Sequence, residues 1–323
     1  MRFFSNWVAV LVLLALAPLA VAQDYPVRAV RIITPYAPGG SADVLTRIAS
    51  QQLTARWGQS VVVDNRAGAS GNIGAELGAR AAPDGYTLLV AGAPHAINMS
   101  LFKKLQYNLE KDYAHISPIA TFPAIVVVHP SLPVKTVKDL VALAKARPGE
   151  LNFASPNNGS PNHLVIELVK SMAKVNMAHI PYKGGSGGQM IGDLLAGQVQ
   201  LASLGLPPAA PLVKSGRLRA IAVTSAKRSA LLPEVPTVSE SGLPGFDLSS
   251  WYGVLAPAGT PRTIVTKVNA DIVAFLGSGD VKTRLASLGA EAAPMSPDDF
   301  ARYVRDEVAK WAKLVQASGA RVE

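Results

Sequence analysis

Short apolar runs alternate with helical hydrophobic periodicities along most of this chain. Residues 30–34 are mostly apolar and predict a buried strand. Residues 41–57 predict a helix, because Val44, Leu45 and Ile48 fall near one face at helical spacing. This rhythm is typical of βαβ units, in which helices cover both faces of a largely parallel sheet. It continues with strands over 61–63 and 86–90 and a helix over 72–81.

A second group of alternating elements begins near Pro123. It ends before residues 251–257, which predict a strand that returns to the first group. The remainder, 261–319, is mostly helical, and its last helix carries apolar residues close to helical spacing. Within the second group, strands are expected over 124–128, 151–154, 178–182, 199–204 and 218–224, and helices over 137–146, from 161 onwards and over 189–196.

This order predicts two α/β lobes, with the second inserted into the first. The first lobe would comprise residues 23–122 and 247–323, and the second would comprise 123–246, so that the chain crosses between them twice. A chain of 323 residues is also too long for most single cores. Ligands of open α/β sheets bind at the carboxyl ends of the strands, which places the expected site between the lobes.

The first 22 residues predict a secretory signal peptide. Arg2 precedes an apolar run, and Ala20-Val21-Ala22 is a small-x-small cleavage motif. An uncleaved membrane anchor is the alternative, although the run is shorter than the roughly 20 residues that span a bilayer. Cleavage after Ala22 would release an exported protein.

The composition excludes several kinds of functional site and partner. The chain has no cysteine, which excludes disulfides, thiolate nucleophiles, cysteine metal sites and a lipoprotein anchor. The formal charge is +9, but Lys and Arg are scattered and no basic helix with interleaved aromatics stands out, so nucleic acid is not an expected partner. The positive balance fits either a solvated basic surface or the steering of anionic ligands.

Two short turns, at 35–43 and 155–163, carry the most specific signal. Each follows a strand and opens a helix, and such a turn aims free backbone N–H groups and the positive end of a helix dipole at one point, where an anion binds. Each turn alone is also compatible with an ordinary βα loop. As a pair in a two-lobed exported chain, they predict a cleft for a carboxylate. Asp43 is compatible with such a site if it caps backbone N–H groups, and His163 would either contact the ligand or cap its helix.

The strongest hint of an enzyme is the segment 184–188. Its pattern G-x-S-x-G matches the nucleophile elbow of α/β-hydrolases, with Ser186 between a strand and a helix. The chain order argues against this interpretation, because the histidine of such a triad follows the serine, whereas all five histidines precede it. A glycine-rich ligand turn explains the segment better, and a secreted serine hydrolase stays as an alternative. The histidines lack metal-ligand spacing and no dinucleotide fingerprint is present, so neither a metal nor a cofactor is expected.

Several stretches, spread over almost the whole chain, together match the sequence pattern of a known family. They are 25–28, 32–40 with Asp43, 65–74, 83–88, 181–184, 193–199, 218–220 with 223–224, 235–237 and 256–261. Taken together they are highly specific, and the chain resembles the Bug-type extracytoplasmic solute receptors, the substrate-binding subunits of tripartite tricarboxylate transporters.

This resemblance implies a periplasmic binding protein that captures a small carboxylate without chemistry. The implied fold is α/β and two-lobed, of the type II-like kind, with mixed, mostly parallel sheets and two crossover strands between the lobes. Membrane permease subunits are the implied partners; presentation of the ligand to a membrane sensor protein is the alternative. A monomer is expected.

The resemblance also assigns ligand-binding residues to four stretches. They are Tyr36, Ala37, Pro38, Gly39, Gly40, Ser41 and Asp43; Gly92, Ala93, His95 and Asn98; Ser155, Asn158, Gly159, Ser160 and His163; and Gly184, Gly185, Ser186 and Gly187. The chain departs from the family pattern at 156–158, at Pro161 and at 206–208, which leaves the ligand's identity open. Few unpaired cationic side chains occur in the candidate pocket loops, which favours a small monocarboxylate or dicarboxylate over citrate.

Overall fold

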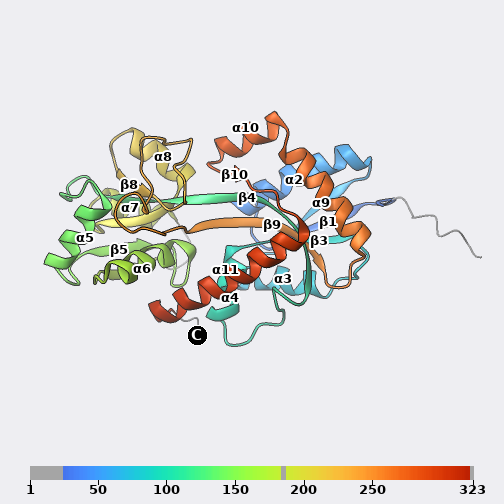
Figure 1. The fold of residues 1–323 in the computed structure, drawn as a ribbon, viewed down its shortest axis with the longest axis horizontal. Coiled ribbons are helices and arrows are strands. Elements are labelled where there is room, and N and C mark those ends of the chain that lie inside the picture. The colour runs from blue at the N-terminus through green and yellow to red at the C-terminus, as the bar shows by residue number, and fades with distance from the viewer. Residues whose placement is uncertain (1–24, 183–186, 321–323) are drawn as a thin grey trace, which may run out of the picture.

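The computed structural model describes residues 25–182 and 187–320, which form two α/β lobes joined by long strands (Figure 1). The two-lobed α/β fold that the sequence predicted is confirmed. Most expected elements are present, with bounds that differ from the predicted ones by a few residues.

Two antiparallel strands run between the lobes. β4 (Tyr113–Val128) pairs with β9 (Ser249–Pro257) as far as Pro123, and its remaining residues pair with strands of the second lobe. The sequence predicted only the end of β4, residues 124–128. The earlier part contains Pro118 and register irregularities, and because proline weakens a strand signal, the hydrophobic pattern hides the length of this strand.

The sheet of the first lobe has a parallel core. β1 (Val30–Thr34) lies between β2 (Val61–Asn65) and β3 (Thr87–Gly92) and pairs in parallel with both. Most of β1 is buried, as its apolar run requires. β9 continues this sheet antiparallel to β3, and the short β10 (Glu291–Ala292) pairs antiparallel with β4. The carboxyl ends of β1 and β3 therefore lie at one edge.

The sheet of the second lobe is smaller and is attached to the end of β4. β7 (Leu201–Gly205) and β8 (Arg219–Val223) pair antiparallel with β4. Beyond β7, the sheet continues in parallel with β5 (Asn152–Ser155) and β6 (Ala178–Pro181). Parallel order thus holds for the outer strands of each lobe, whereas every pairing made by a crossing strand is antiparallel. The carboxyl ends of β5 and β7 share an edge, as those of β1 and β3 do.

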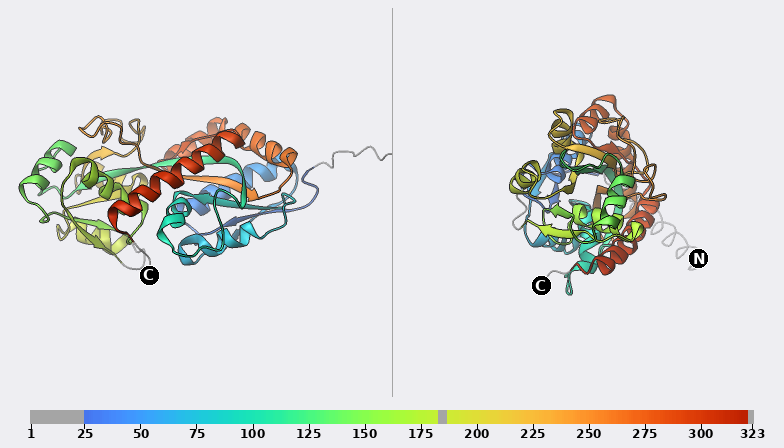
Figure 2. Two further views of the ribbon diagram at one scale, coloured as in Figure 1. Left: turned by 60° about the horizontal axis from the view of Figure 1, so that its bottom comes forward. Right: turned by 90° about the vertical axis from the view of Figure 1, so that its left-hand side faces the viewer.

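Helices cover the sheets of both lobes (Figure 2). Among the residues that the structure describes, no helix has the length and apolar character needed to cross a bilayer. The first lobe holds α2 (Ser41–Trp57), the short η1 (Ala69–Gly71), α3 (Asn72–Ala79), α4 (Ala93–Leu101), α9 (Arg262–Leu276) and α10 (Gly279–Ser287); the second holds α5 (Val137–Ala146), α6 (Pro161–Ala173), α7 (Gly187–Leu195) and α8 (Leu206–Lys214).

The last helix, α11 (Pro297–Ser318), belongs to both lobes. It packs against α4 and β4, and its end packs against α6 of the second lobe. Figure 2 shows it lying along both lobes. Its buried face carries Phe300, Val304 and Trp311, close to helical spacing. Besides the two crossing strands that the sequence predicted, α11 is therefore a third connection between the lobes.

A buried carboxylate fixes α11 on β9. Glu307 is only 2% exposed, and its Oε2 accepts hydrogen bonds from the indole Nε1 of Trp251 and of Trp311, each at 2.9 Å. Lys310 forms an ion pair with the other carboxylate oxygen. A buried charge is tolerated when it is paired and hydrogen-bonded; Lys310 and Trp311 lie on α11 itself, so the bond from Trp251 is the one that attaches the helix to β9.

Candidate functional site: a cleft between the lobes

The two predicted turns meet at one cleft. The cleft has a volume of about 430 Å³, and it is lined by Gly39 and Ser41 from the first turn and by Pro156 and Ser160 from the second. Its floor comes from the parts of β4 and β9 where the chain passes between the lobes. Apolar side chains supply much of the remaining wall, among them Val44, Phe122, Leu206, Leu248, Leu288 and Trp311.

The first turn is held from behind by Asp43. Its Oδ2 accepts hydrogen bonds from Gly39 N and Arg47 Nε, both at 2.9 Å, and its Oδ1 accepts one from Asn65 Nδ2 at 2.9 Å. Burial of the carboxyl opposes its ionisation, but these hydrogen bonds outweigh that effect and hold the pKa of Asp43 below its usual range. Asp43 therefore caps a backbone N–H group, the role compatible with an anion site, and shapes the turn.

The N-terminus of α2 supplies the clearest anion-binding donors. Its N-cap is Gly40, which has no side chain to cap the first N–H groups of the helix. Ser41 is exposed at the first helical position and adds a hydroxyl, and Ala37 and Pro38 form the exposed rim beside it. No charged side chain of the described residues lines the cleft, so backbone N–H groups and the helix dipole dominate its electrostatics.

Three further helices begin at the cleft, and each carries a proline there. Pro94 stands in the first turn of α4, Pro161 in that of α6 and Pro208 in that of α8, and all three line the cleft. Because proline has no N–H, these helix ends offer fewer donors to an anion than α2 does. The strongest anion-binding position is therefore on the first lobe.

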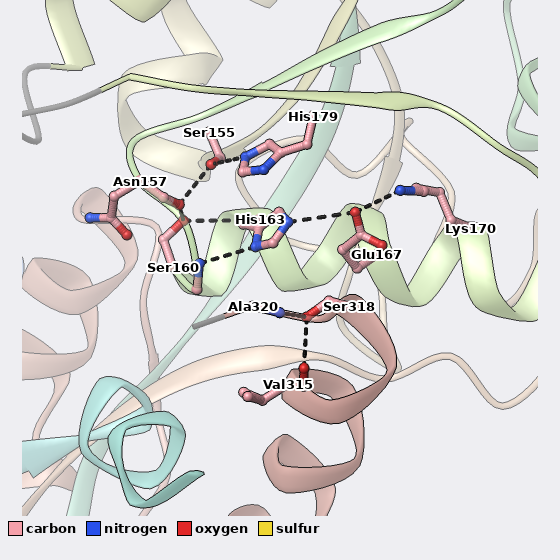
Figure 3. Close-up of polar contacts among 11 residues, drawn as sticks. Ser155, Asn157, Ser160, His163, Glu167, Lys170, His179, Val315, Ser318 and Ala320 are labelled. Atoms are coloured by element: carbon pink, nitrogen blue, oxygen red, sulfur yellow. Dashed lines mark hydrogen bonds and ion pairs between the residues drawn. The ribbon is translucent and has the colours of Figure 1, made fainter. Parts of the chain in front are cut away.

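The second turn is tied together by its own hydroxyls and backbone (Figure 3). The carbonyl oxygen of Asn157 accepts hydrogen bonds from Ser155 Oγ at 2.8 Å and from Ser160 Oγ at 3.0 Å. Ser160 is also the N-cap of α6, where its Oγ accepts from His163 N at 3.2 Å. Asn158 lies exposed at the tip of the turn, and Ser160 is the residue of this turn that brings a hydroxyl to the cleft lining.

Two stacked histidines support this turn. The rings of His163 and His179 lie 3.8 Å apart between centroids at an interplanar angle of 15°. His163 Nδ1 accepts a hydrogen bond from Gly159 N at 3.1 Å, so the ring proton must sit on Nε2, which faces Glu167. Burial, followed by the neighbouring His163, lowers the pKa of His179 to about 4. Figure 3 shows both rings beside the turn, where His163 contacts its backbone, so His163 is a support of the candidate site.

Ser155 is not placed as a nucleophile, although His179 Nε2 lies 2.7 Å from its Oγ. The carbonyl oxygen of Asn157, 2.8 Å away, is an acceptor for the hydroxyl proton of Ser155, and donation to it leaves His179 Nε2 to donate to Oγ in the corresponding tautomer. Ser155 is also fully buried. This pair therefore braces the turn instead of forming a serine–histidine dyad.

The predicted stretch 92–98 lies behind the wall of the cleft. His95 Nδ1 accepts from Gly92 N at 3.1 Å and fixes the corner between β3 and α4, next to the buried Ala93. Asn98 Nδ2 donates to Ser70 O at 3.0 Å and so reaches across to η1. These side chains hold the wall, and Pro94 is the residue of this stretch that lines the cleft.

Tyr36 connects the first turn to the floor. Its ring packs edge-on against His95, with 5.8 Å between centroids, and against Tyr252, with 6.1 Å between centroids. Tyr252 in turn lines the cleft. Burial raises the pKa of Tyr36 well above its usual value, so the phenol stays neutral beneath the anion-binding turn.

The fourth predicted stretch is only partly within the structure. Gly184, Gly185 and Ser186 lie outside the described residues, and Gly187 is the first residue of α7. The sequence reasoning missed the floor of the cleft, formed by Phe122, Ser250 and their neighbours on β4 and β9. One signal was available: strands that cross between two lobes must carry their central residues past any cleft between those lobes.

Two α/β lobes, two crossing strands and a cleft at the carboxyl ends of parallel strands define a two-lobed binding protein of the periplasmic type. Protein BugT of Bordetella pertussis is 39% identical over 306 residues, which cover 94% of this chain and 93% of that protein. The model for the tripartite tricarboxylate transporter family receptors matches residues 45–320. The chain belongs to this family, which confirms the resemblance seen in the sequence.

Solved structures of relatives share the fold over nearly the whole chain. Rpa4515 of R. palustris, a structure with adipate, superposes with a TM-score of 0.79 at 39% identity, covering 93% of this chain and 100% of that one. MatC of Rhodopseudomonas palustris, with bound malate, has a TM-score of 0.74 at 32% identity, covering 90% of this chain and 100% of that one.

Proposed function

We propose that this receptor captures a small carboxylate in the cleft between its lobes. The observation that carries the proposal is the meeting of the α2 N-terminus with Ser160 of the second turn at one cleft, where no charged side chain of the described residues competes for the anion. The relatives whose structures contain adipate and malate support the same ligand class.

The carboxylate would be held by donors from both lobes. Its oxygens would accept hydrogen bonds from the first N–H groups of α2 and from the hydroxyls of Ser41 and Ser160, which are strong because the acceptor is charged. A ligand that contacts both lobes stabilises the closed arrangement over the open one. The lobes that close would be residues 23–122 with 247–323, and residues 123–246.

The setting of this function is the periplasm. We infer that the signal peptide is removed after Ala22, and that the closed receptor is recognised by the membrane permease subunits of a tripartite tricarboxylate transporter. The family match supports this partner class. Within this proposal the protein binds and releases its ligand unchanged, and Ser186→Ala would leave any background esterase activity as it is.

The test is ligand titration of two site variants with matched controls. Ser160→Ala removes a hydroxyl from the cleft, and Gly40→Val places a side chain over the α2 donors, where a Cβ meets only Ala37 O at 3.8 Å. Both are expected to weaken binding of the acid that gives the largest thermal shift in a carboxylate panel, by at least about tenfold, or roughly 1.4 kcal/mol.

The controls repeat the same chemistry away from the cleft. Ser296→Ala removes the N-cap hydroxyl of α11, as Ser160→Ala does for α6, and costs about 1 kcal/mol of stability. Gly279→Val adds the same side chain where nothing lies within 4 Å of a Cβ. Unchanged affinity in the two site variants, or equal losses in the controls, would reject this site.

A further inference from the structure

We propose that the ligand of this receptor is a monocarboxylate with an apolar body, not a di- or tricarboxylate. The inference rests on the proposed function and names the ligand class for the same cleft. Its basis is the uneven distribution of polar groups around the cleft wall, which offers one place for a carboxylate and hydrocarbon contacts for the rest of the molecule.

The polar groups are concentrated at the two turns. Ser41 stands at the start of α2, and Ser160 and Asn162 stand at the start of α6. The prolines in the first turns of α4, α6 and α8 remove N–H groups that would otherwise serve a second anion. A single carboxylate at α2 therefore uses most of the donors that the described lining provides.

The wall on one side of the crossing strands is apolar. Leu206 and Pro208 come from the start of α8, Val44 comes from α2, and Leu288 follows α10. Figure 1 shows α8 and α10 on the same side of β4 and β9, with α6 on the other side. Hydrocarbon contacts from both lobes thus face the part of the cleft that lies away from the second turn.

The floor adds mostly carbon surface, and its polar side-chain groups are the hydroxyls of Ser250 and Tyr252. The rings of Phe122 and Tyr252 pack edge-on, with 5.9 Å between centroids, and both line the cleft. Trp311 also lines it, but its Nε1 proton is already given to Glu307 Oε2 at 2.9 Å. Trp311 is also only 1% exposed, so its indole offers no free donor to a ligand.

A second carboxylate would lose its hydration in this environment without gaining a cationic partner from the part of the lining that the structure describes. None of the Lys, Arg or His side chains that the structure describes lines the cleft, and an unpaired charge against an apolar wall is strongly disfavoured. An alkyl or aryl body at the same place gains from burial instead. The preference should therefore oppose that suggested by the adipate and malate of the two relatives.

The experiment compares acids of equal length that differ in one end group. Calorimetric titration of the full-length mature protein, refolded to remove any co-purified ligand, uses butanoate against succinate, hexanoate against adipate, and 4-methylbenzoate against terephthalate. The monoacid of the best-binding pair is expected to bind at least tenfold more tightly than its diacid. Equal binding, or tighter binding of the diacid, overturns the inference and leaves the carboxylate receptor standing. No saturable binding of any of the six acids overturns both.

Two variants test whether the apolar wall sets this preference. Leu288→Lys and Val44→Lys each add a cation to the apolar side of the cleft lining, and both positions are only half-buried. Each is expected to raise the affinity for the diacid relative to its monoacid at least fivefold. Leu77→Lys makes the same charge change at an exposed residue of α3 outside the cleft lining and should leave the ratio unchanged. If the ratio of diacid to monoacid affinity changes equally in all three variants, the apolar wall does not set the preference for a monocarboxylate.

Discussion

At the scale of single residues, the site depends on side chains that never reach the ligand. His163 lies beside the second turn, where its Nδ1 accepts the Gly159 N–H. Gly159 has φ of 76°, a conformation that glycine adopts without strain. The hydrogen bond and the glycine together fix the path of the chain into α6, and so they fix the position of Ser160.

The first prediction concerns this support. His163→Leu leaves the buried Gly159 N–H without an acceptor and should lower the free energy of unfolding by about 1–3 kcal/mol. It should also weaken ligand binding, because the turn loses its anchor. His163→Asn keeps an oxygen acceptor near the position of Nδ1 and is expected to retain most of both quantities. Urea unfolding and calorimetry measure them, and equal losses in the two variants would contradict the role of Nδ1.

At the scale of elements, α11 is fixed by a charge rather than by packing alone. Glu307 accepts both indole protons, from Trp251 on a crossing strand and from Trp311 on the helix itself. Because Trp311 also lines the cleft, this one carboxylate fixes a part of the ligand wall and the attachment of the third interlobe connection together.

Removing that carboxylate is the second prediction. Glu307→Leu strands two buried indole N–H groups and the ammonium of Lys310, and should destabilise the protein by about 3–5 kcal/mol. Glu307→Gln retains an acceptor oxygen and is expected to cost clearly less. Urea unfolding followed by tryptophan fluorescence separates the two variants. If both variants unfold at the wild-type midpoint, the carboxylate does not fix α11.

The sequence predicted elements best where the hydrophobic period is local and strong. The bounds of α2 and α5 match their predicted ranges, because an apolar face and a clear end are encoded within each segment. The length of β4 was not predicted, since Pro118 interrupts its pattern. The reach of α11 into the second lobe was also missed, because the partners of a helix face are a tertiary property.

The candidate site likewise has parts that local sequence patterns predict and parts that depend on tertiary contacts. The two turns that line the cleft are local features of strand, glycine and helix start, so the sequence could predict their position; that they bind an anion stays a prediction. The floor around Phe122 and Tyr252 is brought together by pairing between strands more than 100 residues apart in the chain, which no local pattern encodes. The support by His163 and His179 could be predicted only in part. The sequence placed His163 in the first turn of its helix but did not indicate its stacking with His179.

At the scale of the whole molecule, two buried histidines, His95 and His115, and the half-buried His179 make stability depend on pH. Burial lowers the pKa of His95, His115 and His179 to about 4 in each case. In the unfolded chain a histidine titrates near 6.5. Between these values the unfolded chain binds more protons than the folded protein, so folding becomes less favourable as the pH falls. Above about 6.5 the three rings are neutral in both states and contribute no pH dependence.

The third prediction follows from that sign. The melting temperature should fall as the pH is lowered from about 6.5 to about 4, and the histidine contribution should level off below that range. His95→Asn keeps an acceptor for Gly92 N but removes one titrating ring, so its melting temperature should fall less steeply over the same interval. Thermal unfolding at a series of pH values measures both slopes. A melting temperature that is constant across the interval would rule out three histidines that are neutral in the fold.

The pairing of β3 with β9 has a consequence for how the protein is made. During synthesis β3 gains β1 on one side, but its other edge stays open until Ser249–Pro257 has been added, after the entire second lobe. α11, which joins the two lobes, is the last element of all. The N-terminal segments therefore have no complete sheet to fold into while the chain is still emerging. For a protein that would be exported across a membrane before folding, this order keeps the polypeptide unfolded until its last segments have crossed the membrane.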